Sequence, residues 1–321
     1  MLGVGQPTPS VYRRRRATAI AVVAALVAVV LAVLGLGDDE PDPAATSAAR
    51  TTSEGARPKL AELPRGGRSI LPEHRVVAFY GAPQDDELGV LGIGRPATAA
   101  RKLEKVARAY TRKTRPVLPA MELIATVAAA HPGDDGKYRI RQTDAVIERY
   151  LRAARKAKAL LVLDIQPGHA DFLEEAMVLE KWLREPDVSL ALDPEWHTPG
   201  SVPGQRIGSV DARTVNAVSA WLSRIVARER LPEKLLVIHQ FTADMVGNKP
   251  AVKPRRGLAI TFNVDGFGDR PNKLAKYAEF TRGERREMFD GFKLFYKEDT
   301  NLMTPGAVLD LRPPPDLVVY E

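Results

Sequence analysis

The sequence predicts an α/β protein with a (β/α)8 TIM-type barrel, preceded by one N-terminal transmembrane helix. Three observations support this prediction. A long uncharged apolar stretch lies near the N-terminus, eight short aliphatic runs follow it, and amphipathic helical stretches lie between most of these runs. Strands that alternate with helices along a chain are typical of a parallel sheet.

The apolar stretch covers residues 19–37, where every residue is Ala, Ile, Val, Leu or Gly. This length is close to the ~20 residues that a helix needs to cross a bilayer. Arginines occupy positions 13–16, and residues 38–40 are acidic. The positive-inside rule therefore places a basic tail, residues 1–18, in the cytoplasm and the rest of the chain outside. A cleaved signal peptide is the alternative, but its apolar region usually has only about 7–15 residues. We expect a bacterial single-pass signal anchor in the cell membrane.

Residues 38–70 are rich in Pro, Ala, Ser, Thr, Gly and charged residues, and they lack apolar periodicity. This composition predicts a disordered extracytoplasmic stalk, followed by a barrel domain over residues 71–321.

The charge and cysteine content exclude several classes of function. The chain has 47 Lys and Arg against 40 Asp and Glu, but four of the basic residues are the arginines before the apolar stretch. The remaining balance is ordinary, so we expect no nucleic-acid partner. The absence of cysteine excludes thiol catalysis, a Cys-ligated zinc site and a lipid-modified cysteine.

The predicted strands are continuous aliphatic runs, as expected for strands buried on both faces. They cover residues 76–80, 117–124, 159–165, 188–192, 235–238, 258–262, 292–296 and 317–320. Helical spacing covers residues 97–110, 143–158, 170–184, 211–228 and, more weakly, 271–288, whereas residues 242–257 and 297–315 look irregular. Eight strands in about 250 residues fit a TIM-type barrel. An open doubly wound sheet is the alternative.

Polar residues follow the strands where a TIM barrel carries its active site. Three strands end in pairs spaced i and i+2, a spacing that shares one face of a strand. These pairs are Asp164 with Gln166, Asp193 with Glu195, and Asn263 with Asp265. Single acidic residues in such positions are often helix caps, but buried carboxylates are unfavourable unless paired or functional. The repeated pattern predicts an acidic cleft.

The segment around Asp193 and Glu195 favours glycoside hydrolysis, which uses two carboxylates flanking the scissile bond. We expect Glu195 as general acid, with Asp193, Asp164 or Asp265 as its partner. A sugar ring could stack on Trp196. Further substrate-binding candidates are Glu122, inside the second predicted strand, and residues at the strand ends: Tyr80, Gln166, His239, Gln240, Asn263 and Glu321. Alternatively, Asp193 caps a turn and Trp196 packs beneath a loop.

No other motif points to catalysis or to a cofactor. The histidines are scattered and form no His-x-x-x-His pair, and the spacing of Asp164, Asp193 and Asp265 does not indicate a metal site. A Gly-x-Ser-x-Gly turn and a full dinucleotide fingerprint are both missing. We expect no metal and no cofactor.

The segments Leu-Val-Leu-Asp-Ile-Gln-Pro-Gly, Ala-Leu-Asp-Pro-Glu-Trp and Asn-Val-Asp-Gly-Phe-Gly resemble a family of exported actinobacterial proteins of uncharacterised activity. This resemblance covers about residues 70–321. Asp193-x-Glu195 also resembles the Asp-x-Glu strand end of barrel-type lysozyme muramidases. Those enzymes carry an acidic residue on the first strand, whereas this strand ends Phe79-Tyr80-Gly81. The resemblance implies hydrolysis of a cell-envelope polysaccharide. A noncatalytic barrel that binds envelope glycan or an envelope protein is the alternative.

Overall fold

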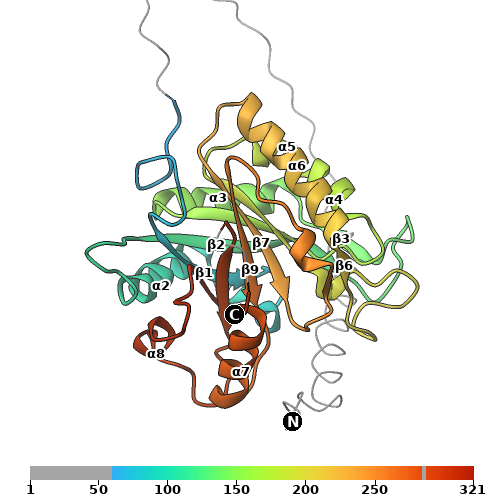
Figure 1. The fold of residues 1–321 in the computed structure, drawn as a ribbon. Helices are drawn as coiled ribbons and strands as arrows, with labels where there is room; N and C mark the ends of the chain where they lie inside the picture. The colour runs from blue at the N-terminus through green and yellow to red at the C-terminus, as the bar shows by residue number, and fades with distance from the viewer. Residues whose placement is uncertain (1–59, 284–286) are drawn as a thin grey trace, which may run out of the picture.

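The computed structural model describes residues 60–283 and 287–321, which form a closed parallel barrel surrounded by helices (Figure 1). Its eight strands are β1 (Arg75–Gly81), β2 (Val117–Ala128), β4 (Leu160–Ile165), β5 (Val188–Leu192), β7 (Lys234–Gln240), β9 (Leu258–Val264), β10 (Phe289–Leu294) and β11 (Leu317–Tyr320). Neighbouring strands follow the order of the chain, and β1 pairs with both β2 and β11. The predicted TIM-type barrel is therefore confirmed, and the open sheet is wrong.

The predicted strands agree with the observed ones except at β2, which continues to Ala128 instead of ending at residue 124, and at β10. This strand begins at Phe289 and ends at Leu294, whereas the sequence predicted residues 292–296. Its first half contains Asp290 and Gly291, which interrupt the aliphatic pattern. Gly291 pairs with Asn263 of β9, and a Cβ at Gly291 would lie 2.6 Å from the Asn263 side-chain oxygen. Close packing between the two strands therefore requires a glycine at position 291. This glycine interrupts the aliphatic pattern, so the sequence did not indicate the first half of the strand.

The helices lie outside the barrel (Figure 1). They are α2 (Pro96–Arg108), α3 (Asp144–Lys156), α4 (Phe172–Val178), α5 (Glu180–Leu183), α6 (Ala212–Arg228), α7 (Arg270–Phe280) and α8 (Pro305–Leu309). Side chains of Thr143, Asp211 and Asp269 cap α3, α6 and α7 by accepting backbone N–H groups. The predicted helix over residues 170–184 is divided at Leu179 into α4 and α5. Helix α8 lies in a connection that the sequence predicted to be irregular.

Short strands and 3-10 helices lie in the loops that connect the barrel strands and helices. Strand β3 (Arg139–Arg141) pairs antiparallel with β2, and β6 (Val210–Asp211) pairs with β8 (Val246–Gly247). The 3-10 helices are η1 (Asp86–Leu88), η2 (Val90–Gly92), η3 (Pro194–Trp196) and η4 (Lys249–Ala251). Helices η1 and η3 contribute side chains to the cleft described below.

Alternation along the strands divides the core into two layers. In β1, Val77 and Phe79 belong to the outer layer, packed with residues of the helices, whereas Val76 and Ala78 belong to the cluster that fills the barrel. The inner cluster is mostly aliphatic and includes Leu118, Leu160 and Val237. This apolar filling gives way to polar side chains toward the carboxyl ends of the strands.

The predicted transmembrane helix and residues 38–59 of the predicted stalk lie outside the described residues. Among the residues that the structure describes, no helix is both long and apolar enough to span a bilayer. Residues 60–70, the end of the predicted stalk, run beside the barrel, with Leu63 and Ile70 buried. Arg65 bonds to the backbone carbonyls of Val117 and Lys158, so this segment contacts the amino-terminal end of the barrel.

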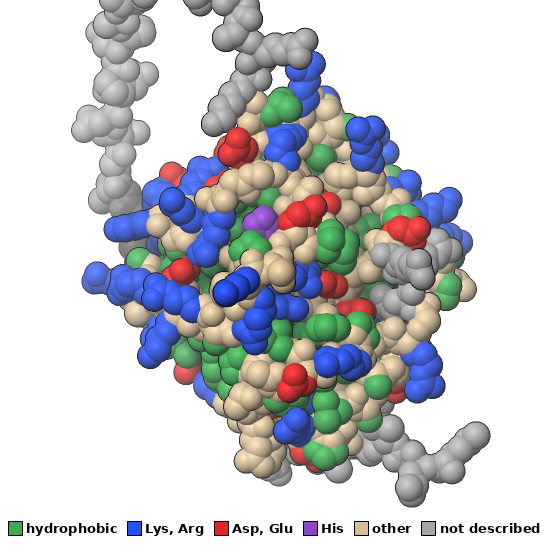
Figure 2. Space-filling model, turned by 60° about the vertical axis from the view of Figure 1, so that its left-hand side comes forward, with side chains coloured by type: hydrophobic (Ala, Val, Ile, Leu, Met, Phe, Trp, Pro, Cys, Tyr) green, Lys and Arg blue, Asp and Glu red, His purple; other side chains and the backbone are tan. Residues whose placement is uncertain are grey.

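The outer surface mixes both signs of charge. Figure 2 shows Lys and Arg side chains over much of the visible face, with Asp and Glu side chains and apolar patches between them. Such mixing is typical of a water-exposed protein surface. In contrast, acidic side chains outnumber basic ones in the cleft at the carboxyl ends of the strands.

Gly168, in the turn after β4, packs closely against a neighbouring backbone segment at the end of the barrel. Its φ is +61°, and a Cβ there would lie 2.4 Å from the Tyr138 carbonyl oxygen and 2.5 Å from that of Lys137. We expect Gly168→Ala to lower the free energy of unfolding by about 1–3 kcal/mol or more, measured by urea denaturation. Gly136 also has a positive φ, of 70°, but a Cβ added there would meet nothing within 4 Å. Equal losses for Gly136→Ala and Gly168→Ala would show that the close contact is unimportant.

Candidate active site

Each of the eight barrel strands, or the residue directly after it, contributes a polar side chain to a layer that crosses the barrel. The members are Tyr80, Glu122, Asp164, Asp193, His239, Asn263, Lys293 and Glu321, and Asp265 lies just beyond Asn263. All are buried except Glu321, whose side chain is 23% exposed. The layer contains five carboxyl groups but only two groups that can be cationic, so its charge balance depends on where protons reside.

A chain of ion pairs crosses this layer with alternating charge. Glu122 Oε1 lies 2.9 Å from His239 Nε2, and Asp265 Oδ2 lies 3.2 Å from His239 Nδ1. Lys293 Nζ lies 3.1 Å from Asp265 Oδ2 and 2.6 Å from Glu321 Oε2. The two cations therefore alternate with three carboxylates, an order in which every close neighbour attracts.

These contacts shift the pKa values of the groups in this row of ion pairs. Burial alone would raise the pKa of Asp265, but Lys293 and His239 hold it well below its usual range. Burial would lower the pKa of His239 and of Lys293, but their carboxylate neighbours raise both pKa values well above the ordinary ones. Asp265 is therefore ionised at neutral pH, between two positive charges.

Asp164 and Asp193 have the opposite character. Burial raises the pKa of Asp164 to about 6 and raises the pKa of Asp193 well above its usual value. The Tyr80 hydroxyl donates to Asp164 Oδ2 at 3.0 Å. The other oxygen, Oδ1, is buried without a hydrogen-bond partner among the described residues. Because a buried carboxylate without enough donors favours its neutral form, Asp193 and Asp164 bind protons at a higher pH than Asp265 does.

An open cleft lies over part of this layer. Its walls include six acidic residues, one lysine, five aromatic rings and a glutamine: Glu87, Asp193, Glu195, Asp265, Glu298, Glu321, Lys293, Tyr80, Trp196, Phe241, Phe267, Phe295 and Gln166. The cavity volume is about 130 Å³. An engineered cavity that holds benzene has a volume of about 150 Å³, slightly more than that of this cleft. The cleft therefore combines carboxyl groups with aromatic surface.

The structure separates the predicted site residues into three groups. Seven line the cleft: Tyr80, Gln166, Asp193, Glu195, Trp196, Asp265 and Glu321. Four are buried in the polar layer and are not part of the cleft lining: Glu122, Asp164, His239 and Asn263. Gln240 lies elsewhere, since its side chain bonds to the Thr242 carbonyl and to Lys249 Nζ. It supports the loop after β7, because strand alternation points it away from the barrel interior.

Asp193 and Glu195 do not share a strand face as their spacing predicted. Strand β5 ends at Leu192, and η3 begins at Pro194, so the period of two stops before Glu195. The prediction that Asp193 caps a turn is confirmed, because its side chain accepts the Glu195 N–H at 3.2 Å. This bond uses one oxygen of a carboxyl group that also lines the cleft.

Lys293 is the main site residue that the sequence did not indicate. It stands between two apolar residues in the β10 run Phe292-Lys293-Leu294 and is only 3% exposed. Its ammonium lies 3.9 Å from the centroid of the Tyr80 ring. A lone lysine within a buried strand needs an oppositely charged partner. Its position in the β10 run could therefore have identified it as a site residue from the sequence.

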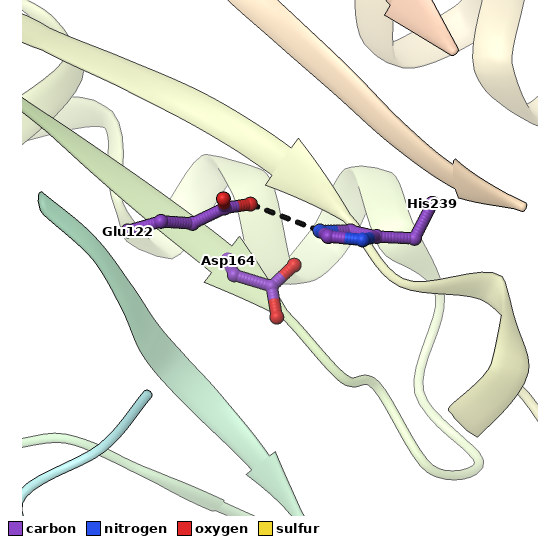
Figure 3. A group of neighbouring side chains, drawn as sticks. All are labelled: Glu122, Asp164 and His239. Carbon is purple, nitrogen blue, oxygen red and sulfur yellow. Dashed lines mark hydrogen bonds and ion pairs between the residues drawn. The ribbon is translucent and has the colours of Figure 1, made fainter. Parts of the chain in front are cut away.

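Glu122, Asp164 and His239 come from three different strands and meet inside the barrel (Figure 3). One potential ligand atom from each lies within 4.8 Å of the others, a spacing that could accommodate a metal ion. However, both ring nitrogens of His239 already face carboxylate oxygens at hydrogen-bond distance. We therefore assign both nitrogens of this ring to hydrogen bonds with carboxylates.

Comparison with known proteins adds no relative from which a function could be transferred. No protein-family model matches the chain, and no curated protein sequence matches it significantly. The resemblance to exported actinobacterial proteins therefore stays a prediction. What is established is a closed eight-stranded parallel α/β barrel with a cluster of acidic residues toward the carboxyl ends of its strands.

Proposed function

We propose that this protein is a membrane-anchored, extracytoplasmic glycoside-hydrolase-like enzyme that acts on a cell-envelope polysaccharide. One observation carries the proposal. Asp193 and Asp265 line the same cleft, yet burial raises the pKa of Asp193 while two cations lower the pKa of Asp265. A pair of carboxyl groups held in opposite protonation states is what acid–base cleavage of a glycosidic bond needs.

The proposed roles follow from these states. Asp193 donates its proton to the glycosidic oxygen as the bond to the sugar breaks. Asp265, ionised, stabilises the positive charge that develops at the sugar ring. Water then adds to the sugar carbon, and a carboxylate takes up the proton that the water loses.

Glu195 and Trp196 complete the cleft. Glu195 was predicted to be the general acid and remains an alternative donor, since it lines the cleft and is only partly buried. We assign the first role to Asp193 because burial favours its neutral, proton-bearing form. Trp196 is partly exposed in the cleft and offers a flat apolar surface to a sugar ring.

The location and substrate class come from the sequence. The apolar stretch at residues 19–37, with arginines before it and acidic residues after it, supports a membrane anchor with the barrel outside. An anchored barrel at that position meets envelope polysaccharide. The likeness of Asp193-x-Glu195 to barrel-type muramidases supports the same substrate class.

The test is to incubate the purified full-length protein with fractions of cell-envelope polysaccharide and to measure both binding and new reducing ends. Cleavage by the wild type is the expected result. Binding without cleavage would instead support the alternative of a noncatalytic glycan-binding barrel. The proposal would be overturned if the protein neither bound nor cleaved any of the fractions.

A further inference from the structure

Glu122 lies in the middle of β2 and is 1% exposed, yet it is not part of the cleft lining. A buried carboxylate of this kind is unfavourable unless a partner stabilises it. Its partner is His239, across the barrel on β7 (Figure 3). His239 in turn contacts Asp265, which lines the cleft. Glu122 is thus connected to the cleft through one imidazole ring.

The hydrogen-bond contacts of the His239 ring indicate its protonation state. Glu122 Oε1 lies 2.9 Å from Nε2, and Asp265 Oδ2 lies 3.2 Å from Nδ1. An ionised carboxylate only accepts hydrogen bonds, and a neutral imidazole has one nitrogen without hydrogen. A neutral ring would therefore place a nitrogen lone pair against a carboxylate oxygen. Two N–H donors, as in the imidazolium, satisfy both contacts.

The other groups around the ring do not replace Glu122. Lys293 from β10 opposes a positive charge on His239, whereas Asp164 from β4 and Asp193 after β5 interact with it electrostatically. The Tyr80 ring of β1 lies edge-on at 5.6 Å between centroids. Asn263 Nδ2, from β9, lies 3.2 Å from Nδ1. Beside an imidazolium, this amide is turned over so that Oδ1, otherwise buried without a partner among the described residues, accepts from the ring. On the Nε2 side, the contact at hydrogen-bond distance is Glu122.

We propose that Glu122 is a positioning residue, which holds His239 as an imidazolium and through it fixes Asp265 in the cleft. Removing the charge of Glu122 leaves the imidazolium with Lys293 as a repulsive neighbour and one carboxylate contact fewer. The ring then loses its proton at a lower pH than in the wild type, and above that pH Asp265 has lost one of its two cationic partners. The catalytic consequence rests on the proposed function, but the state of the ring does not.

Nitrogen-15 NMR of the histidine side chains in the full-length protein tests this directly. The two ring nitrogens have similar chemical shifts in an imidazolium and well-separated shifts in a neutral ring. The signal of His239 is assigned by its loss in His239→Gln. We expect an imidazolium in the wild type at pH about 7, and in Glu122→Gln a deprotonation midpoint lower by about 1–3 pH units.

Two further variants separate positioning from general damage. Asp187→Asn removes another buried carboxylate, paired with Arg155 at 2.7 Å, near the start of β5 at the opposite end of the barrel. It is expected to leave the His239 signal unchanged. Glu122→Asp keeps the charge and is expected to restore the imidazolium at least in part.

The wild-type spectrum alone can overturn the proposal, even if Glu122→Gln does not fold. A neutral His239 at pH about 7 would do so, and so would zinc bound at Nε2. An unchanged deprotonation midpoint in folded Glu122→Gln would also overturn it. If the ring behaves as expected while the wild type cleaves no polysaccharide, the positioning stands and the hydrolase proposal fails.

Discussion

Asp193→Asn is expected to lower kcat/KM for envelope polysaccharide by about 10²–10⁴-fold, the range typical of losing a general acid. Asparagine keeps the shape of the side chain and can still accept the Glu195 N–H, but it has no proton to give. The measurement is the initial rate of reducing-end release by equal concentrations of folded protein. Glu195→Gln, measured beside it, is expected to cause a smaller loss. A larger loss in Glu195→Gln would transfer the acid role to Glu195.

Stability and pH provide controls for this variant. Because burial keeps the Asp193 carboxyl neutral, Asp193→Asn is expected to change the unfolding free energy little, whereas Asp265→Asn leaves two cations without their shared carboxylate. Activity of the wild type is expected to fall as pH rises through the raised pKa of Asp193, since the donor is then deprotonated. An activity that rises over that range would contradict the assignment.

Lys293→Met is expected to lower the free energy of unfolding by about 3–5 kcal/mol at neutral pH, as when one partner of a buried ion pair is removed. Asp265 and Glu321 both contact this ammonium, so its loss leaves two carboxylates close together in a buried layer. Urea denaturation at several pH values measures the effect. The loss is expected to shrink as pH falls, because these carboxylates, whose pKa values rise in the variant, then become protonated.

Lys297→Met is the matched control. Lys297 also contacts two acidic side chains, Asp86 at 3.2 Å and Glu87 at 2.8 Å, but its side chain is 44% exposed. Exposed pairs of this kind contribute about 0–1 kcal/mol. Similar losses in the two lysine variants would contradict the view that burial makes Lys293 essential to the layer.

Most of the barrel could be predicted from the sequence because its strands are buried on both faces. Such strands contain runs of four aliphatic residues, as in β4 and β7, and those runs stand out between amphipathic helices. The prediction failed in the first half of β10, where Gly291 replaces a side chain to make room for Asn263. It also failed at α8, whose five residues are too few to show a helical period.

The site was predicted less completely, because sequence shows which residues follow a strand but not how they pair. Asp164, Asp193 and Asp265 were identified as three similar acids. The structure gives them different properties, since Lys293 and His239 contact Asp265 but burial dominates at Asp193. The bond between Glu122 and His239 joins residues 117 positions apart. No local spacing indicates such a contact.

The most direct test of the central proposal is cleavage of envelope polysaccharide in water enriched in oxygen-18. Hydrolysis of a glycosidic bond places one solvent oxygen at each new reducing end, which mass spectrometry detects. The wild type is expected to produce labelled reducing ends, and Asp193→Asn is expected to produce almost none in the same time. Unlabelled products from the wild type, or equal labelling by the two proteins, would contradict a hydrolase in which Asp193 supplies the proton.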